Sequence, residues 1–312
     1  MIRDIRRTDG DILFALMDRE FPEESALLGG RPEAFQRVVR RVFRWDSRFV
    51  LGLLRLLGRP IFRYVAVEAD RRLVGTTMVT FPRGSAYVSN VVVDPAYRRR
   101  GYAKLMLEEA RRTARGAGRR YLVLDVLDTN TGARTLYDSL GYRPLRSSSH
   151  FVHEELARFE PPPPSDPSLR PFRRTDAPPL VEIVRREHPA RVEQVLPVGE
   201  SRFVHSSFEN RLLETEEAAW VVDRGRGPEA HVGASCSAVF AAANLSAPVV
   251  GPSVEPALAV VLVRTAGAWC AARKAPRILT FVNDENQRGR AALEGAGFRN
   301  AHTSTTLYRP VD

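Results

Sequence analysis

The sequence of 312 residues contains only two cysteines, Cys236 and Cys270. Two thiols exclude a disulfide scaffold and a four-thiolate zinc site, and no group of His, Cys, Asp or Glu residues has metal-ligand spacing. The most apolar run, residues 49–62, is interrupted by two arginines and is too short to span a bilayer. The first residues lack the apolar stretch of a signal peptide. These absences favour a cytoplasmic protein that binds neither a metal nor a membrane.

Lysine is almost missing as well, since 45 of the 47 basic residues are arginine, a skew typical of codon usage in a GC-rich bacterial genome. The formal net charge of +10 is divided unevenly along the chain. Residues 1–160 carry 29 basic and 20 acidic side chains, whereas residues 161–312 carry 18 and 17. We therefore expect the first half to bind the anionic ligand. A nucleic acid is not expected, because the basic half lacks interleaved aromatic residues and a reading helix.

A proline-rich segment divides the chain into two parts. Residues 161–167 can neither continue a helix nor complete a strand ladder, so they predict an extended linker. A chain of this length is at the practical limit of a single core, which also favours two domains. We therefore expect a first domain over residues 1–160 and a second over residues 168–312.

The two parts share segments in the same order. Residues 3–9 match residues 170–176 at five of seven positions. Residues 130–143 and 286–299 carry Asn, Arg, Gly and Arg at corresponding places, at an offset of 156. Repeats in the same order indicate a tandem duplication.

Hydrophobic periodicity in the first half alternates between helical and strand patterns. The expected helices are residues 9–20, 101–116 and 131–140, and the expected strands are residues 62–68, 73–81, 86–93, 121–126 and 151–156. In the second helix we expect Leu105, Leu107, Ala110 and Ala114 on the apolar side. Residues 32–57 suggest an amphipathic helix pair that covers an acceptor or packs against the second half. The pattern belongs to the α+β class (α/β-type), with helices around a sheet.

The sharpest feature is a basic loop between a buried strand and a helix, within the segment Val91–Lys104. Arg98, Arg99 and Arg100 precede Gly101, and the helix follows at once. The first turn of a helix offers unpaired N–H groups and the positive end of its dipole, which together bind anions. Glycine adds no side chain that would hold a pyrophosphate away from the backbone. The loop therefore predicts a phosphate site.

The pattern Arg98-x-x-Gly101-x-Ala103 after a Val-Val-Val-Asp-Pro strand resembles the acyl-CoA signature of the GNAT N-acetyltransferase superfamily, and residues 124–142 resemble its C-terminal motif. The resemblance implies two tandem GNAT-like domains, each a mixed, mostly antiparallel sheet flanked by helices, and acetyl-CoA as acyl donor. It also implies roles for further residues. Backbone groups of Val91 and Val93 would pair with pantetheine, the segment of Arg98, Arg99, Arg100, Gly101, Tyr102, Ala103 and Lys104 would cradle the pyrophosphate, and Asn130 would contact the cofactor arm or order the site.

Acetyl transfer to an amine needs a base for the amine and an acid for the leaving thiolate. By the same resemblance Tyr137 is the general acid, whereas its helical spacing alone would favour a core aromatic. Asp125 matches the position of a general base in some relatives; a solvent-facing carboxylate is the alternative. Asp128, Glu68 and a chain of ordered water remain open as other bases.

The second half lacks these groups. Aligned at the offset of 156, residues 254–259 stand opposite residues 98–103, where the arginines and the glycine are gone and Glu255 would repel phosphate. Leu293 replaces Tyr137. We therefore expect an active first copy and a degenerate second copy that is structural or shapes the acceptor site.

The resulting prediction is an N-acetyltransferase that transfers acetyl from acetyl-CoA to a primary amine of a small molecule or peptide, as a monomer or homodimer. The alternative is a non-catalytic acyl-CoA-binding or scaffold protein.

Overall fold

The computed structural model describes residues 1–20, 37, 62–154, 156, 166–204, 210, 214–238 and 241–312. Most of the proposed linker, residues 161–165, lies outside these ranges, so the domain boundary stays a prediction. The predicted amphipathic stretch 32–57 also lies outside them, apart from Arg37.

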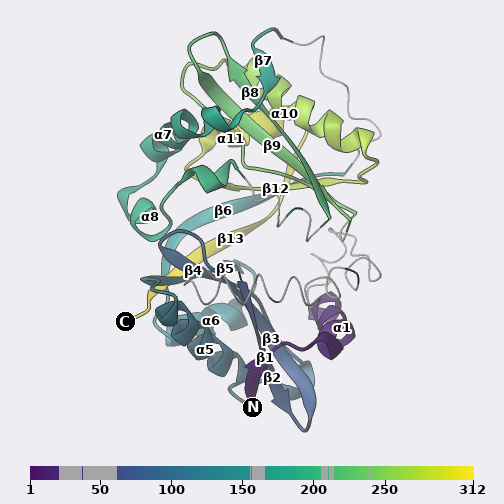
Figure 1. The fold of residues 1–312 in the computed structure, drawn as a ribbon, viewed down its shortest axis with the longest axis vertical. Coiled ribbons are helices and arrows are strands. Elements are labelled where there is room, and N and C mark those ends of the chain that lie inside the picture. Colours follow the sequence, from purple (N-terminus) through teal and green to yellow (C-terminus); the bar gives the residue numbers. More distant parts are fainter. Residues whose placement is uncertain are drawn as a thin grey trace.

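The described first half alternates strands and helices as the sequence predicts (Figure 1). It contains β1 (Ile2–Asp4), α1 (Gly10–Glu20), β2 (Phe62–Ala69), β3 (Arg72–Thr80), β4 (Ser85–Val93), α5 (Tyr102–Gly116), β5 (Tyr121–Leu127), α6 (Thr131–Ser139) and β6 (Arg143–His153), with short 3-10 turns η1 (Arg7–Asp9) and η2 (Pro95–Tyr97).

The described second half repeats this order after residue 166. It contains β7 (Leu169–Pro171), η4 (Arg174–Asp176), α7 (Ala177–Glu187), α8 (Ala190–Val195), η5 (Glu200–Arg202), β8 (Thr215–Asp223), β9 (Pro228–Ser237), β10 (Ala243–Leu245), β11 (Val249–Val250), α10 (Pro256–Ala272), β12 (Ile278–Asn283), α11 (Gln287–Gly295) and β13 (Arg299–Pro310). The α+β class predicted from the sequence is confirmed.

Two details of the sequence prediction were wrong. The last strand of the first half was expected at residues 151–156, but β6 begins eight residues earlier, at Arg143. Its first residues, 143–147, pair with β13, and β12 joins on the other side from Ser148 onward. In α5, Leu105 is 43% exposed, and Met106 occupies the buried position instead.

The described strands form one continuous 13-stranded sheet in the order β1-β2-β3-β4-β5-β13-β6-β12-β10-β9-β8-β7, with β11 paired to β9. The last strand of each half is therefore inserted into the sheet of the other half. β13 pairs with β5, and β6 pairs with β12, so that β6 and β13 run side by side in the middle of Figure 1. The two halves share a sheet instead of packing as separate bodies.

The strand register shows that this exchange is symmetric. Leu122 of β5 faces Arg309 of β13, and the residues 156 positions away, Ile278 and His153, face each other in β12 and β6. Between the exchanged strands, Ser148 pairs with Ser304, which are themselves 156 residues apart. A pseudo-twofold axis therefore passes between these two serines.

The cores follow the same exchange. Phe151 of β6 is buried in the core of the second half, under α10 and α11. Its counterpart Leu307 of β13 is buried in the core of the first half, under α5 and α6. Because each half completes the core of the other, neither sheet is complete without its partner.

The repeated segments fold into the same polar corner. Arg3 donates to both carboxylate oxygens of Asp9 at 2.6 and 2.9 Å, and Arg170 donates to both oxygens of Asp176 at 2.8 Å. Each aspartate also accepts the backbone N–H three residues before it. The charge-assisted bonds explain why the matching residues are the ones retained in both copies.

Candidate active site

The site is built where β4 and β5 part. These parallel strands pair from Ser85 and Tyr121 up to Val88 and Leu124, and no further pairs follow. The last residues of β4, 89–93, thus face β5 without a strand ladder, and we call this unpaired stretch the β4–β5 opening. Backbone groups of Val91 and Val93 lie along it, as the family resemblance implied.

A bulge in β4 contributes to this divergence. The pairing with β3 shifts register between Ser89 and Val92, and Asn90 has a positive φ of 54°. Asparagine tolerates this left-handed conformation better than most residues. Sequence reasoning missed Asn90, although an Asn within a run of β-formers is a signal for a bulge.

The basic loop leads from the opening into α5. Asp94 caps the turn η2 by accepting the N–H of Ala96 at 3.0 Å. Gly101 then adopts a φ of 84°, which a residue with a side chain rarely adopts, and a Cβ there would meet no atom within 4 Å. The first bond of the helix runs from the N–H of Leu105 to the carbonyl of Gly101, so the N–H groups of residues 102–104 precede the helical ladder.

The charged side chains of the loop surround this helix start. Arg98, Arg99, Arg100 and Lys104 are exposed, while Tyr102 and Ala103 are half-buried. The Nε atom of Arg98 donates to the carbonyl of Val93 at 3.2 Å, which turns this side chain back along β4. Exposed N–H groups, an unobstructed glycine and nearby cations suit a pyrophosphate.

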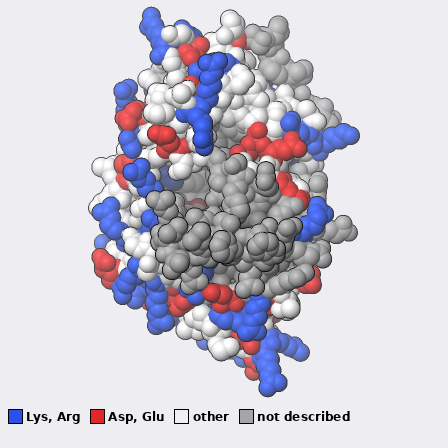
Figure 2. Space-filling view, viewed as in Figure 1, with Lys and Arg blue, Asp and Glu red and all other residues white. Residues whose placement is uncertain are grey.

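The basic charge does not form one broad patch on the face drawn in Figure 2. Lys and Arg side chains there alternate with Asp and Glu over both halves of the described surface. A local cradle at α5 is therefore the better account of the anion site than a general positive field on this face.

Tyr137 lies on α6 and packs into the first-half core against Leu124 and Val126 of β5. Its side chain is 6% exposed, and burial raises the pKa of its hydroxyl to about 12. The ring centroid of Tyr142 is 5.6 Å away. The hydroxyl therefore remains protonated at neutral pH, and Tyr137 is a residue of the first-half core.

Asp125 is the first residue of β5 beyond the last pair with β4. Side chains alternate along a strand, so its carboxylate lies on the sheet face opposite to Leu124, Val126 and Tyr137. It is exposed, and the hydroxyl of Tyr87 donates a short hydrogen bond to it. Asp125 and Tyr137 thus lie on opposite faces of the sheet.

The other proposed bases lie in different surroundings. Asp128 accepts hydrogen bonds from Thr303 and Thr305 at 2.7 Å, and these bonds hold its pKa below the ordinary value. Glu68 lies on β2, two strands away from β4, and accepts the Nε of Arg3 at 2.6 Å. Of the three carboxylates, the structure brings only Asp125 to the opening.

Asn130 and its counterpart Asn286 show how the two halves differ. Each caps the following helix, accepting an N–H from Ala133 at 3.1 Å or from Gly289 at 2.9 Å. Asn286 also donates to the carbonyl of Pro248 at 2.8 Å, across the equivalent opening of the second half. Asn130 makes no such bridge to any described residue, so the first opening is not tied shut.

The helix start is also altered in the second half. α10 begins at Pro256 without a glycine cap, and Glu255 before it pairs with Arg224 at 3.1 Å. A carboxylate thus stands where the first half has Arg99. The second half keeps the elements but has neither the glycine cap nor the arginines at this helix start.

Within the described ranges, no helix is long and apolar enough to cross a membrane. In the same part of the chain, no three His, Cys, Asp or Glu side chains are grouped as metal ligands.

Comparisons with known proteins agree with this geometry. The model of the Acetyltransferase (GNAT) family matches residues 16–142. A tandem GNAT protein from the clavulanic acid biosynthesis pathway aligns over 100% of this chain and 98% of its own, with a TM-score of 0.66 and 16% identity. A GCN5-related N-acetyltransferase from Sphaerobacter thermophilus aligns over 100% and 95%, with a TM-score of 0.63 and 15% identity. A search of curated protein sequences gives no match.

Residues 16–142 thus match the GNAT family, and the whole chain has the fold of tandem GNAT proteins, as the sequence motifs predicted. The family performs acyl transfer, uses acetyl-CoA as donor and acts on amines in general.

Proposed function

We propose that the first half transfers acetyl from acetyl-CoA to a primary amine of a small molecule or peptide. One observation carries the proposal. The β4–β5 opening leads to a glycine-capped helix start flanked by arginines, whereas the equivalent opening of the second half is bridged by Asn286.

Donor binding follows from the backbone around the opening. Val91 and Val93 offer backbone groups that lie outside the β4–β5 ladder to the amide groups of pantetheine, and the residues of the loop hold the pyrophosphate. The loop residues are Arg98, Arg99, Arg100, Gly101, Tyr102, Ala103 and Lys104. Asn130, at the N-terminus of α6, contacts the arm or orders the helix start beside it.

The chemistry divides between the two faces of β5. When bound, acetyl-CoA supplies a thioester carbon for attack. Asp125 takes a proton from the amine as the new N–C bond forms, and Tyr137 gives its hydroxyl proton to the sulfur as the C–S bond breaks. The position of Asp125 and Tyr137 on opposite faces suits these roles, because amine and thiolate lie on opposite sides of the reacting carbon.

Calorimetry with acetyl-CoA, followed by release of free thiol on addition of an amine panel, tests this proposal. Tyr137→Phe should retain acetyl-CoA binding and lose turnover by about 100-fold or more, as expected for removal of a general acid. Tyr142→Phe is the matched control, because its hydroxyl is buried in the same cluster and should leave turnover unchanged. Absence of acetyl-CoA binding would refute the proposal.

The non-catalytic alternative predicts a different result from the same assay. A binding or scaffold protein would bind acetyl-CoA and release no thiol with any amine. Its Tyr137→Phe variant would differ from the parent protein only in stability.

A further inference from the structure

Two arginines lie on the side of the sheet that carries Asp125. Arg146 belongs to β6, and Thr306 of β13 pairs both with it and with Asp125. The three residues thus form a row across adjacent strands, with their side chains on one face. Strands are spaced by about 4.8 Å, so Asp125 and Arg146 are about 10 Å apart along this row. Arg202 reaches the same region from η5 in the second half.

Neither guanidinium has a carboxylate partner among the residues that the structure describes. No Asp or Glu of the described ranges lies within 4.0 Å of Arg146 or Arg202, although Asp125 and Glu285 act on Arg146 from a greater distance. The Nε atom of Arg146 is buried without any hydrogen-bond partner. Arginine side chains withdrawn from water are usually paired. Because these two are not paired with any described carboxylate, their N–H donors are available to an external anion.

The two charges also act on each other. Burial, and then the nearby charge of Arg146, lower the pKa of Arg202 to about 10. Burial likewise lowers the pKa of Arg146. An anion between them would relieve both the repulsion and the lost hydration.

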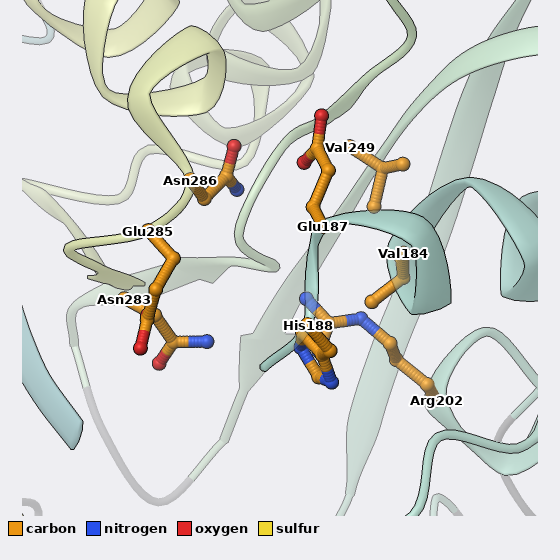
Figure 3. Close-up of a pocket in the computed structure, with 8 residues that line it drawn as sticks. All are labelled: Val184, Glu187, His188, Arg202, Val249, Asn283, Glu285 and Asn286. Atoms are coloured by element: carbon orange, nitrogen blue, oxygen red, sulfur yellow. The ribbon is translucent and has the colours of Figure 1, made fainter. Parts of the chain in front are cut away.

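A cavity lies beside Arg202 (Figure 3). Its volume is about 20 Å³, and Asn283 and Glu285 face His188 and Arg202 across it. His188 adds no fixed charge at neutral pH, because burial and the two arginines lower its pKa to about 4. Glu187 on the same wall is held by Arg288 at 2.6 Å. The open space therefore adjoins an unpaired guanidinium and a neutral imidazole.

We propose that the amine acceptor also carries an oxyanion group, carboxylate or phosphate, which binds between Arg146 and Arg202 while its amine points to Asp125. This inference rests on the proposed function and adds the substrate class. The long side chain of Arg146 brings its guanidinium closer to the carboxylate of Asp125 than the backbone separation suggests. A molecule with few bonds between its amine and its oxyanion therefore fits. The second copy then contributes a binding residue, Arg202, to the reaction of the first.

Kinetics with matched acceptors test the inference. Ethylamine is compared with L-alanine, 3-aminopropanoate and 2-aminoethyl phosphate, which add a carboxylate or a phosphate to the same parent amine; larger amine and amino-acid pairs extend the panel. We expect kcat/KM at least 10-fold higher for one class of oxyanion-bearing amine. The carboxylate and phosphate arms distinguish the two sources of the oxyanion.

Arg202→Met and Arg146→Met should each remove this preference, mainly by raising KM for the oxyanion-bearing amines about 10- to 100-fold. Arg226→Met is the control with the same loss of charge, because Arg226 is exposed in the turn between β8 and β9. A merely structural Arg202 would lower Tm when replaced, whereas an unpaired one should leave it unchanged or raise it.

The outcomes separate the two proposals. If ethylamine reacts as well as its oxyanion-bearing relatives and Arg202→Met changes nothing, the inference fails and the proposed function stands. If no amine reacts, calorimetric titration of the CoA complex with the same carboxylates and phosphates tests the inference separately. The inference still requires that these compounds bind and that Arg202→Met abolishes their binding. Lack of such binding overturns it.

Discussion

The two openings of this protein have the same origin and opposite states. Asn130 and Asn286 occupy equivalent places and cap equivalent helices, yet in the described part of the chain only Asn286 also bonds to a carbonyl on the other side, that of Pro248 between β10 and β11. Gly289 allows this approach, since a Cβ at that position would lie 2.7 Å from the carbonyl oxygen of Pro248. The first half has Ala133 at the same place. A single amide, with one missing methyl group beside it, thus closes one opening.

The comparison shows how a copy can lose a ligand site without losing its fold. The bond from Asn286 satisfies the backbone carbonyl of Pro248 within the second half itself. What remains is a scaffold that donates β13 to the other half and holds Arg202 near the shared sheet. Closure of the second opening therefore leaves the function proposed for the first opening unaffected.

The largest expected effect is on the closed opening. At a solvent-exposed position inside a helix, Gly→Ala stabilises a protein by about 1 kcal/mol. Gly289→Ala should instead destabilise this protein by about 3 kcal/mol, because the added Cβ would clash with Asn286 and Pro248. Urea unfolding measures the difference. The mirrored change, Ala133→Gly, should cost only about 1 kcal/mol. Equal effects at the two sites would contradict the asymmetry described here.

The arginines of the open half provide the next test. Replacing Arg98, Arg99 and Arg100 together by Gln should weaken acetyl-CoA binding about 30-fold, or about 2 kcal/mol, and flatten its salt dependence. Titration calorimetry at two salt concentrations measures both. Glu255→Gln, at the equivalent place in the second half, should leave binding unchanged. Loss of affinity in that control would mean that the second half also meets the cofactor.

A third test compares His150 with its symmetry counterpart, Thr306, by measuring how stability depends on pH. His150 of β6 is the counterpart of Thr306, and burial, followed by the charge of His302, lowers the pKa of His150 to about 4. The unfolded chain takes up this proton near pH 6.5 and the folded chain does not, so stability falls as pH drops from 6.5 to 4. His150→Thr should reduce this fall by about 1–2 kcal/mol. Unfolding curves at pH 7 and pH 4.5 measure the loss of stability between the two pH values. If the variant loses as much stability as the parent protein, a group other than His150 causes the acid sensitivity.

The smallest effect is expected at the two caps. Asn130→Ala should cost about 1 kcal/mol of stability through the lost N-cap, and Asn286→Ala somewhat more, because it also breaks the bond to Pro248. Thermal unfolding resolves this difference. In addition, Asn130→Ala should weaken acetyl-CoA binding, whereas Asn286→Ala should not. The reverse pattern would assign the cofactor to the second half.

Much of the first half could be predicted from local sequence. The strand, the Asp94-Pro95 stop and the arginine loop before α5 are contiguous, so periodicity and turn chemistry reveal them without tertiary information. The duplication could also be predicted from the sequence, because residues 3–9 and 170–176 match. In the structure, Arg3 and Arg170 bind the equivalent aspartates, Asp9 and Asp176. The polar start of β6 was missed, since its partners lie more than 130 residues away.

The chain's sequence by itself determined the GNAT-like motifs, the basic loop before α5 and the existence of two copies, because each depends on residues that are neighbours along the chain. Only the tertiary structure decided that the copies exchange their last strands, that Asn286 bonds to Pro248, and that the charge of Arg146 acts on both Asp125 and Arg202. Those contacts join distant segments, and their geometry depends on strand register across the whole sheet, which no local pattern encodes.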